Sequence, residues 1–132
     1  MANLLCVSHE WHLGFEALRA LVNSGFYIIP ATNGYEALWK YGRSDVDALV
    51  VNRHLPDIDV LEFIHYLKHH NPDIPVVMIS NENPLPKAPP EVDAVIGKHA
   101  AAELLAPTLE VLLMKPTAHR LTEEGNILPQ AA

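Results

Sequence analysis

The chain has 132 residues, of which 49% are apolar, and its formal net charge is −7. This length and composition are typical of one compact domain with a sizeable core. An acidic chain without a basic cluster lacks the electrostatic attraction that nucleic-acid binding requires, so we expect no DNA or RNA partner.

No apolar run in the sequence is long enough to cross a bilayer, and the N-terminus lacks the basic residues that open a signal peptide. We therefore expect a cytoplasmic protein that does not bind membranes. Cys6 is the only cysteine and stands in the first apolar run. An internal disulfide is thus impossible, and a buried, unreactive thiol is expected.

Strand-like and helix-like patterns alternate along the chain, which predicts an α/β fold with a parallel sheet. Short apolar runs predict five strands, namely Leu4–Val7, Phe26–Ala31, a run ending at Val51 or Asn52, Pro75–Ser80 and Val92–Gly97. Longer periodic segments predict helices over Trp11–Ser24, from Asn33-Gly34 to Gly42, over Val60–His70 and over Ala101–Met114. Beyond Lys115 the periodicity is weak, so we expect one domain over residues 1–115 and a flexible C-terminal tail over residues 116–132.

The spacing of apolar residues indicates which side of each predicted helix faces the sheet. The side chains expected to point inward are Phe15, Leu18, Leu21 and Val22 in the first helix, Ala37, Leu38 and Tyr41 in the second, Leu61, Ile64 and Leu67 in the third, and Leu104, Leu105, Leu109 and Leu112 in the last. Pro107 interrupts the last pattern, where it should kink the helix or mark its first turn.

The segment between the fourth and fifth predicted strands is rich in proline. It contains Pro84, Pro86, Pro89 and Pro90. Proline removes a backbone donor and disfavours helical geometry in the residue before it. We therefore expect an extended crossover with at most one short turn from Asn81 to Glu91.

A polar loop follows the third predicted strand. The continuous apolar run Ala48–Val51 is typical of a strand that is buried on both faces. In parallel sheets, chemistry lies just beyond the C-terminal ends of the strands. Asn52 stands at that position here, and the loop from Arg53 to Asp59 follows it.

Five motifs, in order, resemble the receiver domains of response regulators. They are Ser8-His9-Glu10 at the family's acidic cluster, Asn33 to Leu38 at its second helix, Leu55 to Asp59 in its phosphorylation loop, Pro75 to Ser80 with the hydroxyl that contacts the phosphoryl group, and Gly97-Lys98 with its lysine. The resemblance covers residues 3–114 and implies a flavodoxin-like (CheY-like), doubly wound sheet of five parallel strands in the order 2-1-3-4-5, with the fourth helix shortened or lost. It also implies a role in two-component or phosphorelay signal transduction.

The reaction that this resemblance implies lacks its acceptor, because Asn52 stands where the family has an aspartate. An amide is not a nucleophile and cannot form an acyl phosphate. Ser8 and His9 replace the acidic pair, so we expect Mg²⁺ binding to be lost and no cofactor to be bound. Lys98 is retained, and we expect it to hydrogen-bond to Asn52, with Ser80 bonding to either of them. These five residues form the predicted degenerate phospho-acceptor pocket.

Two further departures from the family pattern affect its switch. Val95 replaces the aromatic residue that the family couples to the hydroxyl, so the usual rotation of a ring is absent. His99 replaces the proline that follows the lysine. A cis bond before a residue other than proline costs about 2.5 to 4 kcal/mol, so we expect a trans Lys98–His99 peptide and a displaced Lys98.

The histidines admit a metal-binding interpretation. His9, His54 and His99 are all expected at the C-terminal edge of the sheet, and imidazoles suit Zn²⁺. No tight ligand spacing at this edge supports such a site, so we expect no metal there. The remaining group, His65, His69 and His70, is attributed to the cation preference of a solvated helix end.

Two other sets of residues are candidates for a functional role. Asp57 and Asp59 could replace the phospho-acceptor, but we expect them to project from the loop, away from the lysine. Trp11, Tyr35 and Trp39 could form an aromatic docking patch, although half-buried packing is the favoured interpretation.

The preferred functional hypothesis is a stand-alone receiver-like signalling module that acts by protein–protein interaction without phosphorylation. Its partner would be a sensor kinase or a downstream signalling protein. The alternative is a small-anion or metal-binding module that uses the neutralised pocket. Exposed apolar patches would favour the first hypothesis, and a deep pocket at Asn52 the second. An enzyme is disfavoured, since the sequence offers no nucleophile–base pair and no glycine-rich phosphate loop.

Overall fold

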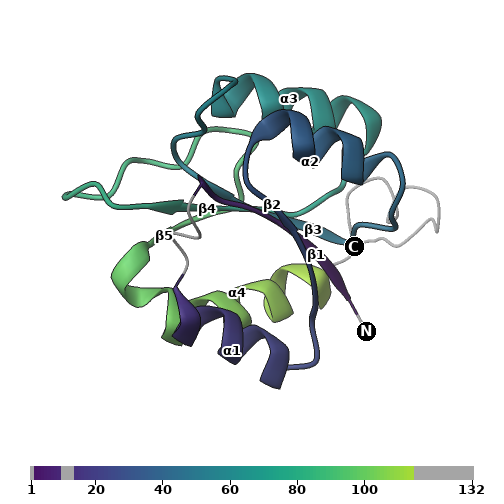
Figure 1. Cartoon of the computed structure of the whole chain (residues 1–132). Coiled ribbons are helices and arrows are strands. Elements are labelled where there is room, and N and C mark those ends of the chain that lie inside the picture. Colours follow the sequence, from purple (N-terminus) through teal and green to yellow (C-terminus); the bar gives the residue numbers. More distant parts are fainter. Residues whose placement is uncertain (1, 10–13, 115–132) are drawn as a thin grey trace, which may run out of the picture.

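The computed structural model describes residues 2–9 and 14–114. Its centre is one parallel sheet of five strands in the order β2-β1-β3-β4-β5 (Figure 1), as predicted. The strands are β1 (Asn3–Val7), β2 (Tyr27–Ala31), β3 (Ala48–Asn52), β4 (Val76–Ser80) and β5 (Ala94–Gly97). Three of them begin one or two residues later than predicted, and the strand order is unchanged.

Helices cover both faces of this sheet (Figure 1). One layer contains α1 (Phe15–Asn23) and α4 (Ala101–Met114), and the other contains α2 (Gly34–Tyr41) and α3 (Val60–His70). Successive strand residues alternate between two separate cores. Leu4 and Cys6 of β1 belong to the core under α1 and α4, whereas Leu5 and Val7 belong to the core under α2 and α3. Strands buried on both faces must be apolar throughout, which explains their unbroken apolar runs.

The ends of the helices follow from local hydrogen bonds. Asn33 caps α2 by accepting from the Glu36 backbone N–H at 2.8 Å, and Asp59 caps α3 in the same way. After α1 the chain turns at Gly25, whose φ of +90° is a conformation that favours glycine. The predicted start of α1 at Trp11 lies outside the described residues.

The predicted inward faces were wrong at four positions. The exposed fractions are 72% at Phe15, 59% at Val22, 42% at Leu61 and 49% at Leu104. Helical periodicity gives an apolar stripe, but the neighbouring elements decide which part of the stripe meets the sheet. The side chains that are buried instead include Ala17 in α1, Val60 and Phe63 in α3, and Ala101 and Ala106 in α4.

The crossover between β4 and β5 contains no helix, which confirms the prediction from its prolines. Pro107 lies inside α4 rather than in its first turn, because the α-helix already starts at Ala101, directly after a short 3-10 helix at Lys98–Ala100. The proline ring is exposed to solvent. Among the described residues, no helix has the length and apolar character needed to span a membrane.

One of the two edge strands of the sheet is β2, which contains Pro30. Tyr27 donates its backbone N–H to Ala2, and Ala31 accepts from the N–H of Ser8, so these two residues and Ile29 between them face β1. Pro30 therefore points its backbone away from the sheet. Its carbonyl accepts a hydrogen bond from the ammonium of Lys40.

Candidate functional site

Four of the five predicted site residues stand at or just after the C-terminal ends of neighbouring strands. Ser8 follows β1, Asn52 ends β3, Ser80 ends β4 and Lys98 follows β5. The strand register places Asn52 opposite Ile79 and Ser80 opposite Gly97. The parallel ladder thus brings these positions to one edge of the sheet, which we call the rim.

The predicted pocket residues differ in burial. Ser8 and Ser80 are buried, with exposed fractions of 3% and 1%, whereas His9 is exposed and Asn52 is half-buried. The hydroxyl of Ser80 accepts a hydrogen bond from the Glu82 backbone N–H at 3.0 Å. Within residues 2–9 and 14–114, the side chain of Asn52 forms no hydrogen bond.

Lys98 does not form the predicted hydrogen bonds. It is exposed, and it makes no hydrogen bond or ion pair with another described residue. It lies in the first turn of the 3-10 helix, and the peptide that joins it to His99 is trans, as predicted. Lys98 therefore makes no contact with Asn52 by hydrogen bond or ion pair, although both follow the C-terminal ends of strands of the same sheet.

His99 folds back over the end of β5. A Cβ atom placed on Gly97 would lie 2.9 Å from Cε1 of the His99 ring, so only glycine fits beneath the imidazole without a shift. Ser80, Lys98 and His99 line a cavity of about 620 Å³ together with Asn81, Glu82, Asn83 and Leu85. The structure therefore joins Ser80 and Lys98 in one cavity, and Asn52 is not among the residues that line it.

Glu82 is a rim residue that the sequence did not reveal. Its carboxylate lies 3.2 Å from Nε2 of His54 and 3.8 Å from Nε of Arg53, so it connects the β3–α3 loop to the β4–β5 crossover. His54 and Glu82 are 28 residues apart along the chain, and no local sequence pattern predicts their pairing. Because all three groups are partly exposed, these ion pairs hold position more than they stabilise the fold.

The carboxylates of the two loop aspartates accept hydrogen bonds from the backbone N–H groups at the N-termini of two helices. The Asp57 carboxylate accepts from the backbone N–H groups of Gly34 and Tyr35, each at 2.9 Å, and Asp59 caps α3. Gly34 is required because a Cβ atom there would lie 2.2 Å from the Ile58 side chain. Both carboxylates are therefore engaged in hydrogen bonds to backbone N–H groups, and neither forms an ion pair with Lys98 among the described residues.

The rim histidines do not gather around a common point. His54 pairs with Glu82, and His99 covers Gly97. Over the described part of the chain, no group of three or more His, Cys, Asp or Glu side chains could hold a metal ion.

Two aromatic residues of α2 lie at the surface. Tyr35 is 63% exposed and Trp39 is 59% exposed, so the half-buried packing favoured for them was wrong. The Arg43 guanidinium stacks over the Trp39 ring at 4.1 Å. Trp11, the third member of the predicted patch, lies outside the described residues.

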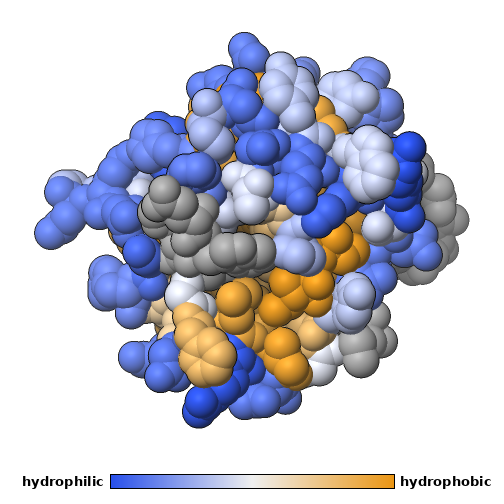
Figure 2. Space-filling view, in the orientation of Figure 1, coloured by the Kyte–Doolittle hydropathy of each residue, from blue (hydrophilic) through white to orange (hydrophobic). Residues whose placement is uncertain are grey.

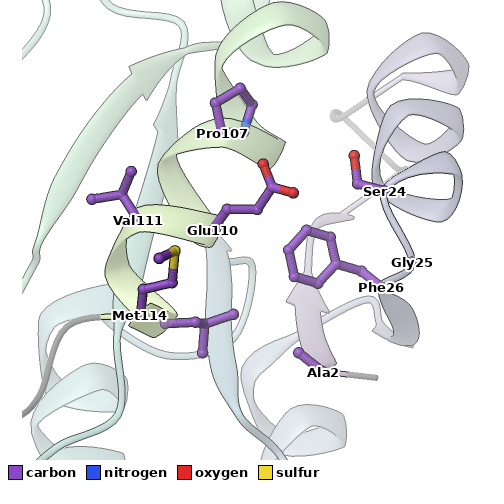
Figure 3. A pocket seen from close by; sticks show the side chains of 9 residues that line it. Ala2, Ser24, Gly25, Phe26, Pro107, Glu110, Val111 and Met114 are labelled. Atoms are coloured by element: carbon purple, nitrogen blue, oxygen red, sulfur yellow. The ribbon is translucent and has the colours of Figure 1, made fainter.

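A second cavity, of about 610 Å³, opens at the opposite edge of the sheet, between the α1–β2 turn and the C-terminal half of α4. Figure 3 shows Glu110 and Phe26 on facing sides of it. Its lining is mainly apolar, and no predicted site residue contributes to it. The predicted site residues therefore lie at the rim and not at this cavity.

Comparisons with known proteins agree with this geometry. The family model described as the response regulator receiver domain matches residues 11–106. The fold is shared with the response regulator TrrA of Thermotoga maritima, which was crystallised in complex with Mg²⁺ and BeF (21% identity, TM-score 0.72, 85% of this chain and 99% of that chain covered). It is also shared with the chemotaxis response regulator CheY4 of Vibrio cholerae (21% identity, TM-score 0.71, 85% of this chain and 98% of that chain covered). The receiver domain of the hybrid histidine kinase CckA has the same fold (23% identity, TM-score 0.70, 86% of this chain and 100% of that chain covered). A search of curated proteins found no match.

Proposed function

The chain belongs to the response regulator receiver family, and we propose that it is a pseudo-receiver, a signalling module that binds a partner protein without being phosphorylated. The observation that carries the proposal is the residue at the end of β3. The family's acceptor aspartate belongs there, and this chain has Asn52, whose amide offers no nucleophilic oxygen. The proposal assigns the chain no catalytic residue.

The residues around Asn52 support the loss of metal-assisted phosphorylation. Ser8 and His9 stand in the positions of the family's acidic pair. Mg²⁺ is a hard ion that binds carboxylate oxygens, and these three positions supply none. TrrA, whose structure contains Mg²⁺ and BeF, provides the contrast. We propose that the rim of this chain does not retain Mg²⁺.

The segment that follows β4 supports a constitutive rather than a switched surface. The family couples its hydroxyl residue to an aromatic ring on the next strand, and Val95 is half-buried at that position, packed against the core under α2 and α3. The crossover has no helix to shift, and Glu82 holds its first residues to the β3–α3 loop. A partner would therefore meet the same surface at all times.

The exposed apolar side chains support a protein partner. Figure 2 shows apolar atoms gathered over α1 and the neighbouring strand β2. We call this the α1–β2 surface; its residues are Phe15 and Val22, which are mostly exposed, and Leu18 and Ile28, which are half-buried. Apolar patches of this kind mark interaction sites. A sensor kinase or a downstream signalling protein is the proposed partner class.

Phosphorylation chemistry tests the proposal directly. Incubation of the full chain with acetyl phosphate and Mg²⁺ should give no acid-labile phosphate adduct by mass spectrometry, because Asn52 cannot form an acyl phosphate. The Asn52→Asp variant should also fail, since the other two carboxylates are missing. Combining it with Ser8→Asp and His9→Asp provides the matched control that can gain the reaction. An adduct on any rim residue of the natural chain would contradict the proposal.

Partner binding tests the proposed surface. Val22→Asp should weaken binding to a captured partner by about 1 to 4 kcal/mol, the usual cost of losing an interface anchor. Tyr66→Asp places the same charge on α3, across the sheet, and should leave the affinity unchanged. Lys98→Ala should also leave it unchanged. Titration calorimetry on the folded proteins measures all three.

The alternative function, binding of a small anion at the rim, is favoured by one observation. The buried hydroxyl of Ser80 and the ammonium of Lys98 line the same cavity. Glu82 lines it too and opposes an anion, which is why we prefer the protein-binding function. If Lys98→Ala abolishes partner or phosphate binding in a folded chain while Val22→Asp has no effect, the alternative takes precedence.

A further inference from the structure

Two histidines one helical turn apart lie on the outer face of α3. His65 and His69 are both exposed, and both line a shallow depression of about 470 Å³. Residues at i and i+4 of a helix are neighbours on its surface, with Cβ atoms about 5 to 6 Å apart. The two imidazoles therefore share one open side of the helix, on the face of the molecule that carries neither the rim nor the α1–β2 surface.

Glu91 in the β4–β5 crossover orients the first of these rings. Its two carboxylate oxygens lie 3.3 and 3.2 Å from Nδ1 of His65. When Nδ1 carries the proton and donates it to the carboxylate, the lone pair of the imidazole is on Nε2, at the opposite side of the ring. A carboxylate that fixes a histidine in this way is the usual outer partner of a metal-binding imidazole.

We propose that His65 and His69 form a surface site for a divalent transition-metal ion such as Zn²⁺, with Glu91 orienting His65. Imidazole nitrogens bind this ion at about 2.0 to 2.1 Å. Fewer than three protein ligands gather anywhere in the described part of the chain, so water would fill the remaining coordination positions. Asp59 and Glu62 line the same depression and add negative charge that attracts a cation.

One side chain must turn for the site to close. The ring of His69 lies edge-on to that of His70, with centroids 5.8 Å apart. His69 is exposed to solvent, and rotation of its ring toward His65 would give up this contact with His70. Mg²⁺ would not bind, because it prefers oxygen ligands to imidazole.

Titration of the untagged full chain with ZnCl₂ tests the site. Calorimetry should show saturable binding of one ion at this site, and MgCl₂ should give no signal. His65→Ala and His69→Ala should each lower the Zn²⁺ affinity by about 10-fold or more, because losing a metal ligand costs at least as much as losing a residue that only orients one. Glu91→Gln should lower it by about 10-fold. His70→Ala, on the adjacent position of the same helix, is the matched control and should leave the affinity unchanged.

Imidazole resonances identify the ligands independently of affinity. In ¹H–¹⁵N spectra, Zn²⁺ should shift Nε2 of His65 and His69 first. The inference is overturned if the histidines at other positions shift first, if His70→Ala weakens binding as much as His65→Ala, or if no saturable binding occurs. Alanine is the best helix former, so the variants should remain folded, which circular dichroism verifies.

Discussion

The half-buried side chain of Glu36 accepts several hydrogen bonds near the start of α2. Its carboxylate accepts hydrogen bonds from the backbone N–H and the hydroxyl of Thr32 at 2.7 and 2.8 Å, and it pairs with Lys40 at 3.1 Å. The bonds from Thr32, followed by the contact with Lys40, lower its pKa from 4.5 to about 2. All of these contacts favour the ionised form.

This shift predicts a pH dependence of stability. The pKa of Glu36 is lower in the folded chain than in the unfolded chain, so the unfolded chain binds the proton more tightly. The stabilisation is fully present above pH 4.5 and is lost as the pH falls toward about 2. Because the Glu36 side chain is partly exposed, its contribution to the free energy of unfolding is about 1 kcal/mol or less. Urea denaturation of Glu36→Gln should lack this part of the pH dependence, and NMR titration of the Glu36 carboxyl should give the lowered pKa directly.

At the scale of elements, α2 and the β3–α3 loop are fastened together through the Asp57 carboxylate. It satisfies two N–H groups at the start of α2, where the helix dipole also favours a negative charge. Ile58 packs against Gly34 at the same junction. The loop that follows β3 is therefore held in place by the neighbouring helix.

Removing this carboxylate should loosen α2. Asp57→Ala should destabilise the fold by about 1 to 3 kcal/mol, because it leaves two helix donors without their charged acceptor. Asp57→Asn retains one acceptor oxygen and should cost less. Chemical denaturation measures both variants, and equal stability of Asp57→Ala and the natural chain would show that water replaces the carboxylate without loss.

The same scale shows what the sequence could predict. The five strands and the missing helix followed from unbroken apolar runs and from four prolines, which act locally, whereas the strand order was implied by the resemblance to receiver domains. The outward turn of Phe15 and Val22 did not follow, because neighbouring elements select the buried stripe. The pairing of Glu82 with His54 and the absence of a hydrogen bond between Lys98 and Asn52 depend on how separate loops meet in space. The rim positions were therefore predictable, whereas the contacts between them were not.

At the scale of the whole molecule, the reactivity of the Cys6 thiol depends on whether the chain is folded. It lies in β1, beside the centre of the sheet, and has an exposed fraction of 0%. Burial raises the pKa of its thiol to about 12, so the reactive thiolate is scarce at neutral pH.

Thiol labelling should therefore follow global unfolding. A chromogenic disulfide reagent should leave the native chain unmodified and should react in urea along the same transition that circular dichroism reports. Cys6→Ser abolishes the signal and serves as the blank. Rapid labelling under native conditions would show that β1 opens locally while the rest of the sheet remains folded.

Pro30 has a consequence for how copies of this chain meet one another. The exposed edge of a sheet is a template for adding a further strand, and such additions lead to aggregation or to recognition through backbone bonds. In β2 the outward position of Pro30 has no N–H to offer, and its carbonyl is already taken by Lys40. Strand addition at this edge therefore lacks one backbone donor and one free acceptor, which disfavours it beside the exposed apolar side chains of the α1–β2 surface. Recognition of this side of the molecule by a partner then depends mainly on side chains.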